Sequence, residues 1–241
     1  EVNIARSSVQ EVYDQIVEDM TAAGPLVPGI KQLGFGGAIS KSAVRGMLAR
    51  VYLTMAGEPL KDVSKYQDAK DWAKKVMDDV GAGHRLNPSY PDIFIELAQN
   101  KYDIGESIWE VEHYGDNVNA SKSYREYTST GWINGVTSLN GSITGWGEAY
   151  MSVTPKFYNV FEDGDLRKWW SIAHFTYVTV KDPAENGLKL MKGVPPNEID
   201  KWQYQPAKWR REYEPESSRF SGNNSPTYNA TNHPLLRYSD V

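Results

Sequence analysis

Ser42-Ala-Val-Arg-Gly-Met-Leu-Ala-Arg-Val-Tyr-Leu, residues 42–53, is the most informative helical pattern in this chain. Its apolar side chains recur at steps of three and four residues, as one face of an α-helix requires. Residues 48–52 match the Leu-Gly-x-x-Tyr part of the tetratricopeptide consensus, with Ala49 in place of glycine. The pattern continues to Met55, and Gly57 lies beyond the expected end. We therefore expect one helix of a tetratricopeptide-like hairpin.

The preceding segment predicts another helix. Ser7 or Ser8 can cap its start, and Gln10 or Glu11 occupies the reciprocal position of a capping box. Apolar residues then recur at helical spacing until Gly24-Pro25, which ends the pattern.

The following segment predicts the partner helix of the hairpin. It begins near Ser64, where Gln67 completes a second capping box, and Gly81 follows its end. Ala69 and Ala73 are small, so two helices can approach closely. Its expected buried stripe contains Tyr66, Ala69, Trp72, Ala73, Val76, Met77 and Val80.

The pattern changes after Gly83. Residues 90–97 indicate a short helix or turn, and Thr154-Pro155 indicates another helix start. Alternating or β-branched and aromatic residues predict short strands at 106–113, 169–180 and 202–213. Polar segments rich in Gly, Asn, Ser or Pro predict long loops at 114–150, 181–201 and 214–232. An apolar pattern from Pro234 predicts the start of a final helix.

These elements predict a mainly α fold, an α–α superhelix of tetratricopeptide-like hairpins with an irregular part that contains a few short strands. We expect a helical part over residues 1–100, a loop-rich mixed part over 101–233, and the start of a truncated helix over 234–241. Both ends resemble cuts in a longer protein, because the chain starts without Met and ends inside a helical pattern.

Composition excludes several classes of function. The 241 residues carry a net charge of −5 and no basic block, which argues against a nucleic-acid partner. No apolar run approaches the roughly 20 residues that span a bilayer. Cysteine is absent, so disulfides, thiolate nucleophiles and zinc–thiolate sites are excluded.

Aromatic residues in the predicted loops give the main functional signal. Seven of the eight tryptophans lie between Trp109 and Trp209, several of them beside Gly, Asn, Ser and Thr. Flat rings beside amides and hydroxyls suit a sugar, because a ring covers C–H surface while the polar groups bond to hydroxyls. The alternative is that most of these rings belong to the core, since Trp is highly buried on average.

The candidate ligand-binding residues follow from this argument. We expect Trp132, Trp146 and Tyr150 to be stacking platforms, with Tyr114, Asn134 and Asn140 as neighbours or partners of hydroxyl groups. Trp202 and Trp209 are weaker candidates, because a strand could bury either ring.

Catalytic signals are weaker. The four histidines share no metal-binding spacing, no Gly-x-Ser-x-Gly elbow occurs, and we expect no metal or cofactor. Glu110 and Glu112 would share a strand face, and glycosidases need two carboxyl groups roughly 5–9 Å apart. A solvated strand face is by far the more frequent explanation of two such residues. For Asp163 and Asp165, an ion pair with Arg167 that holds a turn is the simpler account, and calcium remains open.

Four segments together resemble the SusD/RagB family. They are residues 42–53, Glu106-Ser-Ile-Trp-Glu-Val, Thr154 to Arg167 with its Asp-x-Arg ending, and Pro234-Leu-Leu-Arg-Tyr-Ser-Asp-Val. In the last segment Ser239 stands where the family usually has Ala. The order and approximate spacing of the segments also agree, and the match covers nearly the whole chain but only a central part of the family's length.

The resemblance implies a surface-exposed lipoprotein of the outer membrane in Bacteroidetes-type bacteria. Such proteins resemble lids on TonB-dependent (SusC-like) transporters, capture glycans or in some members peptides, and are not enzymes. The lipid anchor that the family implies is absent from this chain. The motif residues Tyr52, Trp109, Asp165, Arg167 and Arg237 fit structural roles, and the family's ligand face is variable, so no binding residue transfers by motif.

Three hypotheses follow. The chain belongs to a glycan-binding surface protein; or it is a tetratricopeptide-type scaffold for a protein or peptide; or it is a glycoside hydrolase that uses one of the two carboxylate pairs. The first is favoured by the motifs and the loop aromatics together.

Overall fold

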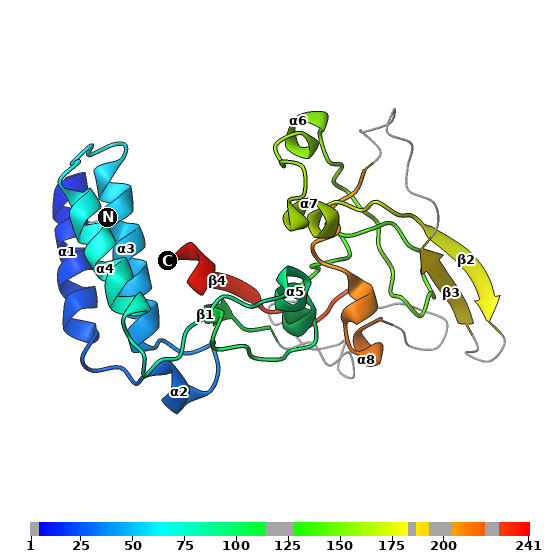
Figure 1. Ribbon diagram of the computed structural model, residues 1–241, viewed down its shortest axis with the longest axis horizontal. Coiled ribbons are helices and arrows are strands. Elements are labelled where there is room, and N and C mark those ends of the chain that lie inside the picture. The colour runs from blue at the N-terminus through cyan, green and yellow to red at the C-terminus, as the bar shows by residue number, and fades with distance from the viewer. Residues whose placement is uncertain (1–4, 114–127, 183–186, 193–203, 220–226) are drawn as a thin grey trace. The chain divides into compact units, whose positions relative to one another are not determined.

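A computed structural model describes residues 5–113, 128–182, 187–192, 204–219 and 227–241 (Figure 1). Helices predominate, as expected. The chain forms two compact units. The helical unit contains Glu1–Leu86, Tyr102–Val111 and Pro234–Val241, and the aromatic unit contains Asn87–Lys101 and Glu112–His233. This division by contacts differs from the sequential division at residues 100 and 233, because the chain leaves and re-enters each unit.

The helical unit is built on a hairpin. Helix α3 (Lys41–Ala56) packs against α4 (Lys65–Met77), and α1 (Val9–Ala23) packs against α3 (Figure 1, blue to cyan). A short helix α2 (Ile30–Leu33) lies between α1 and α3 in the sequence. The predicted capping box at the first helix is confirmed: the Glu11 N–H donates to Ser8 Oγ (3.2 Å), and the Ser8 N–H donates to Glu11 Oε2 (2.8 Å).

The predicted start of α4 near Ser64 is confirmed, but the predicted capping box is absent and the predicted buried stripe is wrong in part. Ser64 bonds to Asp62 Oδ1 (2.5 Å) and Gln67 donates to Asp71 (2.8 Å), so no capping box forms between Ser64 and Gln67. Only Ala69 and Val76 in α4 are fully buried. The exposed members of the expected stripe are Tyr66, Met77 and Val80. Helix α3 is the main helix neighbour of α4, because α1 packs against α3. Only the face of α4 that meets α3 is therefore buried.

A two-stranded sheet completes the helical unit, and it corrects the prediction for the C-terminal segment. Residues His233–Arg237 form strand β4, which pairs with β1 (Ser107–Val111), and only Tyr238–Asp240 turn into a 3₁₀ helix, η3. Leu236 is buried with Ala43, Val76 and Ile108. A short apolar run fits a strand or a helix, and its pairing with a distant strand selects the strand.

The aromatic unit contains short elements. They are α5 (Tyr90–Ala98), α6 (Pro155–Tyr158), α7 (Leu166–Ser171), the hairpin β2 (Tyr177–Asp182) with β3 (Gly187–Lys192), the 3₁₀ helix η2 (Arg211–Tyr213) and α8 (Glu216–Arg219). The expected strand at 169–180 is wrong in its first half, where α7 lies, and the expected loop at 181–201 contains β3. The described part of 202–213 forms an isolated bridge and η2 instead of a strand.

Helix α7 begins where it does because Asp165 caps it. The Asp165 carboxylate accepts the Arg167 N–H at 2.9 Å and pairs with the Arg167 guanidinium at 2.6 Å. The predicted Asp–Arg bridge is thus confirmed. The helix buries Trp170 against Phe94 of α5, a contact that only the folded chain provides.

Candidate ligand-binding site

The loop that carries the predicted aromatics is irregular but ordered by backbone hydrogen bonds. The Glu148 N–H donates to the Trp132 carbonyl (2.9 Å) and the Tyr150 N–H donates to the Ile133 carbonyl (2.9 Å). Gly131 and Gly145 have φ values of +86° and +89°, which favour glycine over any residue with a side chain. Two separate stretches of loop are therefore held side by side, and their aromatic residues meet.

Three of the predicted residues form one aromatic cluster, which consists of Trp132, Trp146 and Tyr150. The Trp132 ring lies 5.7 Å from the Trp146 ring and 5.7 Å from the Tyr150 ring, both in edge-to-face geometry. The two indoles are half-buried and Tyr150 is 67% exposed. The cluster is therefore not sealed inside the unit. The Trp132 Nε1–H is buried and has no hydrogen-bond partner within the described residues.

A buried polar network around Arg211 bonds to the backbone of the loop. Arg211 donates from Nη1 to the Trp146 carbonyl (2.8 Å) and from Nη2 to the Ser218 carbonyl (2.5 Å), and its Nε lies 3.2 Å from Glu214 Oε2. A side chain at Gly131 would meet Arg211 at 2.8 Å, and one at Gly145 would meet it at 3.0 Å. Arg211 therefore fills the space that the two glycines leave, and it joins the loop to η2 and α8.

Asn229 extends this network to the start of the loop. Its Nδ2 donates to Glu214 Oε1 (2.9 Å) and to the Thr130 carbonyl (2.6 Å). Thr128 and Asn229 also form an isolated antiparallel bridge. Burial raises the pKa of the Glu214 carboxyl to about 7, although the neighbouring Arg211 and Arg219 guanidinium groups oppose this shift. A carboxyl group with a raised pKa therefore lies among the hydrogen bonds that connect the start of the loop to Arg211.

The other predicted residues have mixed positions. Asn134 accepts the Gly131 N–H at 2.7 Å and is half-buried. Asn140 is exposed in the turn in which the Ser142 N–H donates to the Leu139 carbonyl (3.2 Å). Tyr114 lies outside the described residues, as does Trp202. Trp209 is half-buried and meets Phe94 edge to face at 5.4 Å.

Trp169 is not among the predicted ligand-binding residues. It is 59% exposed at the surface of α7, and its ring lies 4.2 Å from that of His174. The sequence pattern predicts a strand at Trp169, where the ring would be packed. The signal that could have revealed its position is Asp165, a helix cap four residues earlier.

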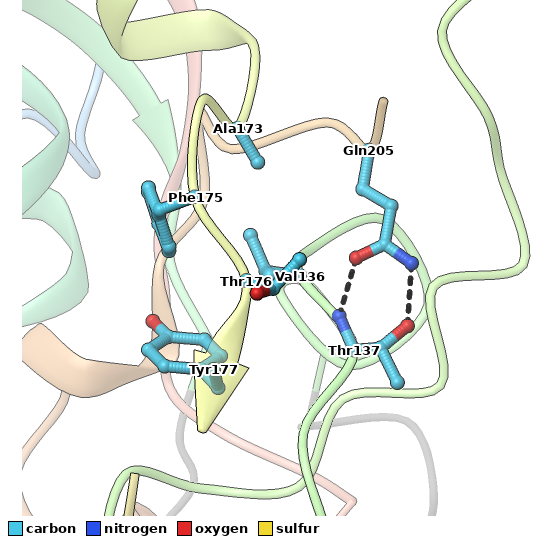
Figure 2. A pocket seen from close by; sticks show the side chains of 7 residues that line it. All are labelled: Val136, Thr137, Ala173, Phe175, Thr176, Tyr177 and Gln205. Atoms are coloured by element: carbon cyan, nitrogen blue, oxygen red, sulfur yellow. Dashed lines mark hydrogen bonds between the residues drawn. The ribbon is translucent and has the colours of Figure 1, made fainter. Parts of the chain in front are cut away.

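Two pockets lie beside the loop in the aromatic unit. The first has a volume of about 380 Å³, and Figure 2 shows its lining. Its amide and hydroxyl groups pair with each other: Gln205 Oε1 accepts the Thr137 N–H (2.8 Å), and Gln205 Nε2 donates to Thr137 Oγ1 (2.5 Å). The second pocket has a volume of about 400 Å³, and Asn134, Phe157 and Trp209 contribute to its lining.

The carboxylate pairs do not form a site. Glu110 is buried at 3% exposure, so its side of β1 is not the solvated face that one interpretation expects, while Glu112 is exposed and belongs to the aromatic unit. Asp165 is engaged by Arg167, whose hydrogen bonds lower the pKa of the Asp165 carboxyl. Among the residues that the structure describes, no three His, Asp or Glu side chains gather to hold a metal ion. No helix in those same ranges combines the length and apolar composition needed to cross a bilayer.

Comparison with known proteins gives the family context. Residues 1–53 match a SusD-like family model described as "Starch-binding associating with outer membrane". A SusD homologue from Bacteroides thetaiotaomicron aligns over 99% of this chain and 46% of its own, with a TM-score of 0.76 and 24% identity. No protein with a curated description matches the chain.

This chain has a SusD-like fold. The resemblance to the SusD/RagB family and the mainly α fold class are thereby confirmed. A laminarin-binding SusD-like protein aligns over 97% of the chain and 49% of its own length, with a TM-score of 0.62 and 21% identity. Surface glycan-binding protein A from Bacteroides thetaiotaomicron, in complex with laminarihexaose, aligns over 96% of the chain and 48% of its own, with a TM-score of 0.57 and 18% identity. The SusD-like chain thus spans about half the length of these structures.

Two of the SusD-like motifs meet in the helical unit. The Tyr238 N–H donates to the Glu106 carbonyl (2.7 Å), and Arg237 Nη1 lies 3.7 Å from the buried Glu106 Oε1. These contacts join β4 to the start of β1. The motif residues Glu106 and Arg237 therefore have structural roles in this SusD-like chain.

Proposed function

We propose that this SusD-like chain belongs to a non-catalytic glycan-binding protein at the surface of the outer membrane, which delivers its ligand to a TonB-dependent transporter. The aromatic cluster of Trp132, Trp146 and Tyr150 is its docking surface. The observation that carries the proposal is the meeting of three loop aromatics at a surface that is partly open to solvent. Two proteins with the same fold, one that binds laminarin and one in complex with laminarihexaose, support it.

The physical basis is stacking. A sugar ring presents C–H groups on its faces, and an indole or phenol ring covers them without fixing the identity of each hydroxyl. The Trp132 ring is inclined by 63° to the Trp146 ring and by 73° to the Tyr150 ring, so the three rings do not form one flat platform. A binding protein of this kind needs no paired carboxylates, and the two predicted pairs do not lie in the cluster.

The test is affinity gel electrophoresis of the full-length protein through gels that contain laminarin, starch or other polysaccharides. We expect Trp146→Ala and Tyr150→Ala to weaken retention, each by roughly two- to tenfold in affinity, the range of an aromatic contact. Trp72→Ala is the matched control, because this half-buried indole lies in the helical unit. Full retention of both cluster variants in a gel that retains the unmodified protein would overturn the proposed site.

Peptide binding is a second candidate function, because the helical unit carries a groove. The groove has a volume of about 320 Å³, and small residues on both helices of the hairpin, Gly46, Ala49, Ala69 and Ala73, line it beside Leu53. Small side chains let another backbone approach closely. Retention that survives changes to the aromatic cluster but is lost in Ala49→Trp or Ala73→Trp would favour this function.

A further inference from the structure

The second pocket of the aromatic unit, here the Asn134–Trp209 pocket, lies next to the aromatic cluster in the chain. Segments 132–134 and 150–152 each contribute residues to the cluster and to the pocket. The hydrogen bond from the Tyr150 N–H to the Ile133 carbonyl (2.9 Å) holds these two segments together. The pocket volume of about 400 Å³ falls in the usual range of small-molecule sites.

Aromatic and apolar side chains form much of the pocket surface. Phe157 is 46% exposed, and Met151 is also exposed. Trp209 is half-buried, and its edge-to-face contact with the buried Phe94 at 5.4 Å holds the indole in place. The His233 ring lies 6.3 Å from the same indole. An indole that its neighbours hold in place stacks on a sugar ring at low cost in conformational entropy.

Polar groups of the pocket lining still have hydrogen-bonding capacity. The Gly131 N–H fixes Oδ1 of Asn134 at 2.7 Å, so the amide has one orientation. Within the described residues, Asn134 Nδ2, the Ser152 hydroxyl and Trp209 Nε1 make no hydrogen bond, and none of them is among the buried unsatisfied atoms. A ligand in the pocket can therefore accept hydrogen bonds from these three donors. In the pocket of Figure 2, by contrast, Gln205 and Thr137 bond to each other.

We infer that the Asn134–Trp209 pocket is a second carbohydrate subsite, which binds the sugar residue next to those that lie on the aromatic cluster. The inference rests on the proposed function and extends it: an oligosaccharide long enough to reach both places binds more tightly than a shorter one. Asn134 Nδ2 donates to a hydroxyl group of that sugar, and Trp209 covers one of its faces.

The experiment measures affinity against chain length. Full-length protein is titrated with a di-, tetra- and hexasaccharide of laminarin and, in parallel arms, of starch, mannan and galactan. Ser152→Trp fills the pocket from an exposed position and removes no hydrogen bond within the described residues, and Ser7→Trp, an exposed serine in the helical unit, is its matched control. Asn134→Asp keeps an oxygen for the Gly131 N–H and removes the Nδ2 donor.

We expect the unmodified protein and Ser7→Trp to gain affinity from the disaccharide to the hexasaccharide. In Ser152→Trp and Asn134→Asp, the affinity for the hexasaccharide should fall roughly two- to tenfold, while the affinity for the disaccharide should stay unchanged. Equal gains in Ser152→Trp and Ser7→Trp, with binding still lost in Trp146→Ala, would overturn the subsite and leave the proposed function intact. Absence of binding to every arm by the unmodified protein would overturn both.

Discussion

At the scale of single residues, Arg211 has the largest structural effect on the candidate site. Its guanidinium is buried, pairs with Glu214, and donates to the carbonyl of Trp146. Removal of one partner from a buried ion pair leaves the other charge without compensation. The aromatic cluster is therefore held by residues that never touch a ligand on its surface.

We predict that Arg211→Ala lowers the free energy of unfolding by about 3–5 kcal/mol at pH 8, where Glu214 is ionised. Urea denaturation followed by tryptophan fluorescence measures the loss. Arg167→Ala is the control, since its ion pair with Asp165 is at the surface, where solvent screens the attraction. Equal stability of the Arg211 and Arg167 variants would contradict the role assigned to the buried network.

A pH dependence follows from Glu214. Burial raises the pKa of this carboxyl from 4.5 to about 7, so the folded state binds the proton more tightly than the unfolded state does. Its contribution to stability is therefore fully present below pH 4.5 and is lost as the pH rises through 7.

Burial lowers the pKa of His84 and His174, and this change adds stability as the pH rises through the same range. We therefore expect the free energy of unfolding of the unmodified protein to fall relative to that of Glu214→Gln between about pH 5 and pH 8. Denaturation midpoints at several pH values test this. If the free energy of unfolding changes with pH in Glu214→Gln as it does in the unmodified protein, another group causes the pH dependence.

At the scale of elements, the packing of β4 on α3 is the contact that the sequence pattern missed. A side chain at Gly46 of α3 would lie 2.5 Å from Leu236 Cδ2, and Leu236 is 1% exposed. Gly46 is therefore a point at which strand and helix approach very closely, and the two residues should be coupled energetically.

We predict that Leu236→Ala costs about 2–5 kcal/mol through the cavity it leaves. Gly46→Ala alone should cost about 1–3 kcal/mol through overpacking. In the double variant, the methyl group added at position 46 fills part of the cavity, so the combined cost should be smaller than the sum. A double-mutant cycle by urea denaturation measures this coupling, and strict additivity would contradict the packing of β4 against α3.

At the scale of the whole molecule, the family motifs and the candidate ligand-binding residues lie mostly in different units. The helical unit carries the hairpin and the motif contacts between β1 and β4, whereas the aromatic unit carries the cluster, the buried network and both pockets described beside the loop. Glycan and peptide hypotheses therefore place the ligand on different units, and one measurement can distinguish them.

We expect a saturating oligosaccharide to slow amide hydrogen exchange in residues 128–152 and 204–219 and to leave α3 and α4 unchanged. The physical reason is that a bound ligand stabilises the unit whose opening would release it. Mass-spectrometric exchange with and without ligand provides the comparison. Protection confined to α3 and α4 would instead support peptide binding in the helical groove.

Local patterns were sufficient for the elements whose signals lie within a few residues. The helices around residues 9–23, 41–56 and 65–77 and the strand at 107–111 all follow from periodicity and capping within one segment. The loop glycines likewise indicate an irregular segment, in which both indoles prove to be half-buried. Such signals need no partner from elsewhere in the chain, so the residue order alone carries them.

Long-range contacts fixed the remaining features. The strand at 233–237 depends on β1, and the burial of Glu110 and the exposure of Val80 depend on which neighbours pack against β1 and α4. Backbone hydrogen bonds within the loop bring Trp132 and Trp146 together, and Arg211, which lies far along the chain, donates to the Trp146 carbonyl. Burial and pairing are properties of distant groups brought together, and a sequence window of one helix or strand contains only one side of each such contact.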